Sequence, residues 1–212
     1  MKKVLFAVLV VLGLALTPGT SHAILGVEID DITTDFTNGS WNLGWRFQVN
    51  NDITVTDLGL YDDGKNGFSA DGISHIAALW TDDGTLLSSV EVTGSSELDN
   101  WFRFESIDPV LLSSGSIYRI AAITGSQNYT WNPNIVNYHP DITFLEDRWT
   151  LGTTLLFPES TQFIGDGFFG GNFRAGQGDG GNDNVVPEPA SMMLLGSGLL
   201  GMIGIRNRKA KV

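Results

Sequence analysis

Apolar and polar residues alternate along short runs between residues 24 and 174, and this alternation constrains the fold more than any other feature of the sequence. Trp45, Phe47 and Val49 alternate with polar neighbours, and the same period of two resumes at residues 53–57. Side chains at every second position of a β-strand share one face, whereas an amphipathic helix needs apolar residues three or four positions apart. The pattern therefore predicts strands rather than helices.

A hairpin is the clearest local element. Ile76, Ala78 and Trp80 fall on one face of a predicted strand, and Asp83-Gly84 supplies the turn. Residues 87–92 form the returning strand. We expect Trp80 to share the buried face of the domain with Trp45 and its neighbours.

The remaining strands are predicted from shorter runs. They lie at 101–107 and 117–124, with Pro109 and residues 113–115 at their connection, and more loosely around 142–144 and 155–157. About eight short strands separated by turns are typical of a sandwich. We predict an all-β fold, a jelly-roll-like two-sheet β-sandwich over residues 24–174, flanked by an N-terminal signal peptide and a C-terminal single transmembrane helix.

The N-terminus has the three parts of a secretory signal peptide. Lys2 and Lys3 precede the apolar run Val4–Leu16, and small residues lead up to Ala23. The alternative, a buried helix, would need a polar face that this run lacks. We predict a signal peptide over residues 1–23, cut by signal peptidase between Ala23 and Ile24.

The charge of the domain excludes one class of partner. Residues 24–184 carry 6 Lys and Arg against 23 Asp and Glu, a formal charge of −17. Such a surface repels phosphate backbones, so we expect no nucleic acid as partner. The chain has no cysteine, so packing alone must hold the exported domain together.

The C-terminus predicts a tether and a membrane segment. Residues 175–186 are rich in Gly, Asp and Asn and are predicted to be a flexible linker. Residues 190–205 are uncharged and mostly apolar, but short for a permanent span, so we expect transient membrane insertion. The basic tail, residues 206–212, should stay in the cytoplasm and place the domain across the membrane.

The sequence between linker and span resembles a known sorting signal. Val186, Pro187, Glu188, Pro189 and Ala190, followed by a glycine-rich apolar span and a basic tail, resemble the PEP-CTERM signal of Gram-negative bacteria. The resemblance implies recognition of the Pro-Glu-Pro tripeptide within residues 187–212 by an exosortase in the inner membrane. It further implies transfer to the cell surface or extracellular matrix. A plain type I anchor is the alternative.

The domain itself shows a second resemblance. The runs GWRFQV, LGLYDDG, GISHIAALWTDDGTLL, IYRIAA and FFGGNF resemble an uncharacterised family found in bacterial surface proteins, often in front of the same sorting signal. The match runs from about Trp41 to Phe173. Because the function of that family is not established, the resemblance implies a fold and no site.

Catalytic signals are sparse. Only His75 and His139 follow the predicted signal peptide, and we expect His75 to be a structural hydrogen-bonding residue within a strand. Neighbouring carboxylates are frequent, but a glycosidase needs two at a fixed separation across a cleft, which a sequence does not reveal. We therefore expect no catalytic residues and no enzyme, and keep a secreted hydrolase as the second alternative.

One loop has weak calcium character. Asp62, Asn66 and Asp71 loosely follow the spacing of a calcium loop, but Ile73 stands where a bidentate glutamate is needed. We favour a glycine-rich connection with solvated aspartates, no metal site and no cofactor.

Tryptophans suggest a ligand. Six tryptophans lie in the domain, and Trp131 is the best candidate for an exposed ring that stacks on sugars. We expect a structural or adhesive surface protein of the matrix or biofilm, in contact with extracellular polysaccharide, with a carbohydrate-binding module as the first alternative.

Overall fold

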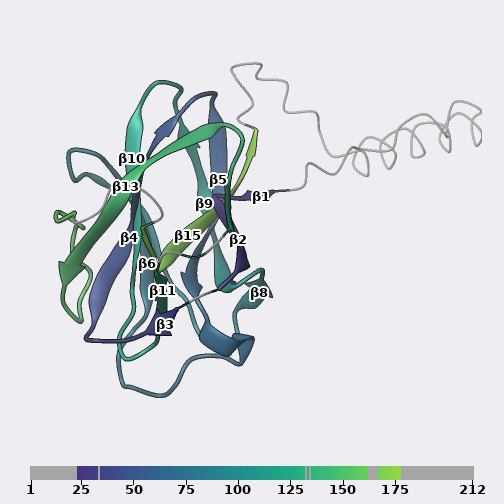
Figure 1. The fold of residues 1–212 in the computed structure, drawn as a ribbon. Helices are drawn as coiled ribbons and strands as arrows, with labels where there is room; N and C mark the ends of the chain where they lie inside the picture. The colour runs from purple at the N-terminus through teal and green to yellow at the C-terminus, as the bar shows by residue number, and fades with distance from the viewer. Residues whose placement is uncertain (1–22, 33, 132, 134, 162–166, 178–212) are drawn as a thin grey trace, which may run out of the picture. The chain divides into compact units, whose positions relative to one another are not determined.

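The computed structural model describes residues 23–32, 34–131, 133, 135–161 and 167–177 (Figure 1). The predicted signal peptide before Ala23, the linker beyond Gln177 and the predicted sorting signal with its motif Val186–Ala190 lie outside these residues. Within the described part of the chain, no helix is long and apolar enough to cross a membrane.

Two antiparallel five-stranded sheets form the body of the domain (Figure 1). Their strands are β1 (Ile24–Leu25), β4 (Trp41–Val49), β5 (Ile53–Tyr61), β6 (Ile76–Thr81), β7 (Leu86–Glu91), β8 (Glu97–Asp99), β9 (Phe102–Leu112), β10 (Ile117–Ile123), β13 (Ile142–Leu151) and β15 (Gly171–Gln177). The first sheet has the order β1-β15-β5-β9-β8 and the second the order β13-β4-β10-β6-β7. Without the edge strands β8 and β13, the other eight strands pair in the order of a jelly roll. The predicted all-β, sandwich-like fold is confirmed.

Smaller elements complete the domain. They are β2 (Val27–Asp31), β3 (Asp35–Phe36), β11 (Tyr129–Trp131), β12 (Ile135–Tyr138), β14 (Phe168–Phe169) and a 3-10 turn, η1 (Asp63–Lys65). β12 pairs with β2, and a three-stranded sheet has the order β14-β11-β3. β14 contacts both β4 and β13, so the three-stranded sheet packs at one end of the second large sheet.

The core lies between the two large sheets. Trp45 and Phe47 of β4 are fully buried, and their ring centroids lie 5.5 and 5.1 Å from that of Phe173 in the opposite sheet. The Trp45 indole donates a hydrogen bond to the Gly171 carbonyl oxygen at 2.9 Å. A side chain at Gly171 would come within 2.7 Å of the Ala121 backbone, so the close approach of β15 to β10 requires glycine.

Trp80 is buried on a different face from the one predicted. It is 4% exposed, but it packs with two alanines of β6 and β10 on the outer face of the second sheet. Phe157 covers it there, with the ring centroids 6.1 Å apart. The expected shared face with Trp45 is wrong, because Leu79, at the alternate position of β6, is the residue that faces the core.

Residues 152–160, the covering segment, cross that outer face. The Leu156 N–H donates to Asn42 Oδ1 at 2.9 Å, and the Pro158 carbonyl accepts from Arg119 at 2.8 Å. The strand predicted at the centre of this segment is absent, because its backbone groups are bound by side chains of the sheet below.

β13 is much longer than the short strand predicted at 142–144. It pairs with β4 along its whole length, with a register shift between Phe144 and Glu146. This bulge, together with several charged residues, interrupts the period of two, which is why the sequence indicated a loop.

A second bulge explains two other differences. The pairing of β5 with β9 shifts between Val55 and Asp57, so Asp57 does not continue the buried face of Val55. Pro109 lies inside β9 rather than in a connection. A residue without an N–H is tolerated at a bulge because the ladder hydrogen bond is already interrupted there.

The end of the domain lies three residues beyond the predicted boundary. β15 continues to Gln177, and Ala175 is fully buried. Residues 175–177 are therefore strand rather than linker. Ile24 pairs with Ala175, so the chain enters and leaves the domain at the same place.

Candidate functional site

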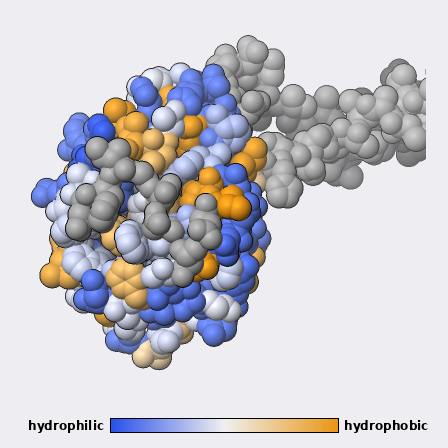
Figure 2. Space-filling view, in the orientation of Figure 1, coloured by the Kyte–Doolittle hydropathy of each residue, from blue (hydrophilic) through white to orange (hydrophobic). Residues whose placement is uncertain are grey.

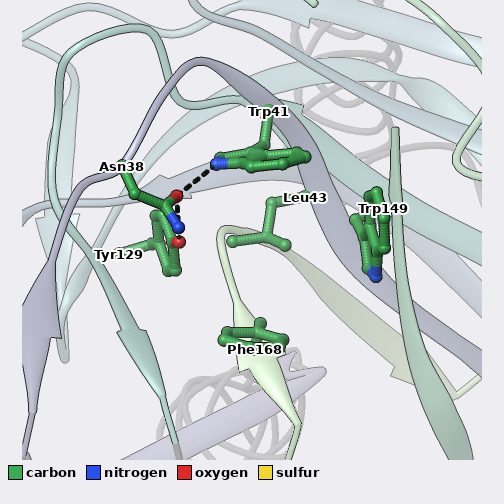
Figure 3. Close-up of a pocket in the computed structure, with 6 residues that line it drawn as sticks. All are labelled: Asn38, Trp41, Leu43, Tyr129, Trp149 and Phe168. Carbon is green, nitrogen blue, oxygen red and sulfur yellow. Dashed lines mark hydrogen bonds between the residues drawn. The ribbon is translucent and has the colours of Figure 1, made fainter. Parts of the chain in front are cut away.

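An aromatic pocket lies at the end of the sandwich where the three-stranded sheet meets β4 and β13 (Figure 3). Its volume is about 130 Å³, and its lining residues are Asn38, Trp41, Leu43, Tyr129, Trp149 and Phe168. We call this set the aromatic pocket. Four of the six are aromatic residues, and they come from four different strands.

Aromatic contacts hold the walls of the pocket. The ring centroids of Trp41 and Trp149 lie 5.2 Å apart with an interplanar angle of 86°. Tyr129 and Phe168 make a second edge-to-face pair at 5.8 Å. Trp149 faces Leu43 in the β13–β4 ladder, so strand pairing fixes its position as well. Rings held by such pairs present their shape without rearrangement.

Asn38 closes one side of the pocket with a fixed amide. Its Oδ1 accepts a hydrogen bond from Trp41 Nε1 at 2.8 Å and another from the Tyr129 hydroxyl at 2.8 Å (Figure 3). Burial raises the pKa of Tyr129 above its ordinary value of 10.0, so the hydroxyl is protonated at neutral pH and can donate.

The pocket is uncharged within a strongly acidic domain. None of the described residues that line it carries a charge, although residues 24–184 have a formal charge of −17. Apolar ring faces beside a few polar groups suit an uncharged ligand that has both hydroxyl groups and an apolar face, such as a sugar ring.

Trp131 lies beside the pocket rather than in it. It ends β11, is 37% exposed, and stacks on Phe168 with centroids 6.2 Å apart and an interplanar angle of 25°. The predicted exposure of this ring is confirmed, although it lies in a strand and not in a loop. Because Phe168 also lines the pocket, the Trp131 ring adjoins the site.

Outside the pocket, hydrophilic residues cover most of the face shown in Figure 2, and hydrophobic residues occur there in small groups. Exposed apolar groups of this size are ordinary for a folded domain. The aromatic pocket differs from these groups in having a defined shape and a lining of four aromatic rings.

The three weak calcium candidates, Asp62, Asn66 and Asp71, do not all line one site. Asp62 is buried, lies 2.6 Å from Arg103 Nε and accepts a hydrogen bond from the Gly67 N–H. Asp62 and Asn66 line one polar pocket of about 210 Å³, whereas Asp71 lines another.

Asp71 has its own donors. It accepts hydrogen bonds from the Ile73 N–H and from both the N–H and the hydroxyl of Ser126. Burial alone would raise the pKa of Asp71, but these hydrogen bonds stabilise the carboxylate and lower its pKa below the ordinary value. In the parts of the chain that the structure describes, no group of three or more His, Cys, Asp or Glu side chains is arranged to hold a metal ion.

The two histidines have separate partners. His75 precedes β6 rather than lying within it; its Nδ1 is 3.0 Å from the Ile123 carbonyl oxygen and its Nε2 is 3.5 Å from Asp71. His139 accepts from the Asp141 N–H, and burial lowers its pKa. These contacts fit the structural role expected for His75.

The sequence did not predict that the carboxyl groups of Asp35 and Asp63 lie close together. Asp35 accepts a hydrogen bond from the Tyr61 hydroxyl at 2.6 Å, and the carboxyl of Asp63 is a close neighbour. Burial raises the pKa of Asp35, and the charge of Asp63 adds to the rise. The pair brings together residues 28 positions apart, which no local pattern indicates.

Comparisons with known proteins match both parts of the chain. Residues 28–162 match a domain of unknown function, DUF4082, and residues 185–209 match the PEP-CTERM protein-sorting motif. The comparison with curated proteins and the comparison with solved structures gave no significant match.

These matches define an exosortase-sorted protein that is exported, processed at the membrane and delivered to the cell surface. Because the DUF4082 match covers more than half of the chain, the chain belongs to the DUF4082 family.

Proposed function

We propose that the domain is a non-catalytic adhesion module that holds an uncharged polysaccharide of the extracellular matrix in the aromatic pocket. The observation that carries the proposal is an uncharged pocket of tryptophan, tyrosine and phenylalanine rings in an otherwise acidic domain. Anionic polymers are repelled by a charge of −17 within a Debye length of about 8 Å, so a neutral polymer is the favoured ligand.

The position of the pocket supports presentation to the outside. β15 begins beside the pocket, since Phe168 and Phe169 immediately precede it, and ends at Gln177. At about 3.3 Å per residue, seven strand residues separate the two points by roughly 20 Å. Ile24 pairs near the same far end. A tether attached after Gln177 would therefore start at the end of β15 that lies away from the pocket.

The expected affinity is low at one site. An aromatic contact contributes on the order of 1 kcal/mol, and a pocket of about 130 Å³ admits one sugar ring rather than an oligomer. Retention in a matrix would then depend on many copies acting on one polymer, since linked sites raise the effective concentration.

Processing at both ends is part of the proposal. Ile24 is the first residue of β1, so cleavage by signal peptidase after Ala23 would leave the fold intact. β15 requires that exosortase cut beyond Gln177. Intact-mass analysis of the secreted protein should give a chain that starts at Ile24 and lacks residues 206–212; a mass that includes them would favour a plain anchor.

Retention on insoluble polysaccharide tests the adhesive function. The wild type should be retained on cellulose or chitin, and Trp149→Ala should abolish retention. Trp131→Ala should weaken it, because this ring only adjoins the pocket. Leu111→Ala, an exposed side chain on β9, is the control and should bind normally.

Thermal unfolding must accompany the binding assay, so that loss of retention is separated from loss of the fold. If the folded wild type is not retained on any uncharged polysaccharide, a structural role without a ligand replaces adhesion. Release of soluble sugar from the polymer would instead support a secreted hydrolase.

A further inference from the structure

The polar side of the aromatic pocket contains one amide, that of Asn38, whose oxygen already accepts two hydrogen bonds from other lining residues. An indole N–H can only donate a hydrogen bond, so the atom of Asn38 that contacts Trp41 Nε1 must be the oxygen. The same oxygen accepts from the Tyr129 hydroxyl. Two independent donors therefore fix the amide orientation, and the Asn38 amino group is the part left to face a ligand.

We propose that Asn38 is a specificity-determining residue that selects an uncharged sugar ring over a cationic one. This inference rests on the proposed function of the aromatic pocket. The Asn38 amino group would donate hydrogen bonds to a hydroxyl or carbonyl oxygen of the sugar, while Trp41 and Trp149 contact its apolar face.

The overall charge of the domain and the local lining of the pocket act differently on a cationic ligand. The overall charge of −17 attracts cations to the domain in general. Inside the pocket, however, the described lining residues offer no carboxylate, and the Asn38 amino group carries partial positive charge. An ammonium group placed there would gain contacts with aromatic ring faces but no anionic partner, whereas a hydroxyl or carbonyl oxygen would gain the Asn38 amino donor, so the amide is the group that favours the uncharged ring.

A single substitution separates the two halves of the amide. Asn38→Asp keeps an oxygen for Trp41 and Tyr129 but replaces the amino group by a second, negatively charged oxygen. The walls of the pocket should stay in place because both existing hydrogen bonds can form. The ligand-facing group, in contrast, changes from donor to acceptor.

The experiment measures affinities of the full secreted protein for three soluble oligosaccharides, those of cellulose, chitin and chitosan, at pH 6, where chitosan is cationic. Asn38→Asp should lose about tenfold in affinity for the two uncharged ligands, the value of one hydrogen bond of about 1.4 kcal/mol. It should gain affinity for chitosan, and added salt should reduce that gain.

Asn50→Asp is the matched control. Asn50 is exposed and follows the end of β4 opposite to Trp41, so this variant adds the same charge far from the pocket. It should leave the affinity for uncharged ligands unchanged. A gain for chitosan equal to that of Asn38→Asp would show that the effect is due to overall charge and would overturn the inference.

Two further variants keep the outcomes distinct. Asn38→Ala adds no charge but removes both the donor and the oxygen that holds Trp41 and Tyr129. It should weaken binding of uncharged ligands at least as much as Asn38→Asp and give no gain for chitosan, and it carries the test if Asn38→Asp does not fold. If Trp149→Ala abolishes binding but both Asn38 variants bind uncharged ligands as the wild type does, the inference fails and the adhesive function stands. If the wild type binds none of the uncharged ligands, the adhesive function itself fails.

Discussion

Trp80 connects the outer face of the second sheet to the covering segment, and its replacement by alanine should destabilise the domain. The side chain is 4% exposed and packs against Phe157, over which Arg119 lies at 4.5 Å. Loss of a buried tryptophan typically costs 3–5 kcal/mol. Because the covering segment can settle into the space left behind, we expect the lower end, about 3 kcal/mol.

Urea denaturation and thermal unfolding measure this cost. For a domain of this size, about 3 kcal/mol corresponds to a fall in Tm of roughly 6–12 °C. Hydrogen exchange should show increased opening at residues 152–160 before the rest of the domain. Trp131→Ala, at a 37% exposed ring, should cost less than about 1 kcal/mol. Equal costs for the two variants, or unchanged exchange in the covering segment, would refute the packing described for Trp80.

Three other perturbations have defined outcomes. Asp35→Asn should raise Tm at neutral pH. The pKa of Asp35 is raised in the folded state, so the stability of the wild type falls as pH rises from the unfolded pKa of 3.8 through the folded value. A neutral amide at this position removes that loss of stability. The gain of the variant should vanish below pH 3.8, and a gain that does not depend on pH would contradict this origin. Millimolar Ca²⁺ should raise Tm only slightly, and NaCl at matched ionic strength should reproduce that rise. If micromolar Ca²⁺ stabilised the domain strongly and Asp62→Asn removed the stabilisation, the domain would have a dedicated calcium site. Glu188→Ala should leave Tm unchanged but retain the chain in the membrane fraction, whereas normal surface delivery would count against recognition of the tripeptide.

The parts of the fold that follow the period of two were predictable. The hairpin of β6 and β7 matches its predicted range closely, because alternation and an Asp-Gly turn are local signals. β4 contains the predicted alternation at Trp45, Phe47 and Val49 but begins four residues earlier, at Trp41. The length of β13 was not predictable, because a bulge after Phe144 and several charged residues interrupt its alternation of apolar and polar residues. The burial of Trp80 was predicted but not its face, since the alternation of β6 does not say which side of a sheet is the core.

The aromatic pocket was beyond sequence reasoning for a different reason. Asn38, Trp41, Tyr129, Trp149 and Phe168 come from separate elements and meet only through the sheet pairing. Tryptophan content indicated a stacking surface, and the exposed ring was identified correctly.

Tryptophan indole resonances test the central claim most directly. The secreted protein contains six tryptophans, and ¹H–¹⁵N spectra resolve the indole N–H of each. On titration with an uncharged oligosaccharide, we predict shifts at Trp41 and Trp149, a smaller shift at Trp131, and none at the buried Trp45 and Trp80. Unchanged indole signals at saturating sugar, or shifts confined to tryptophans outside the pocket, would contradict the proposal that this pocket binds polysaccharide.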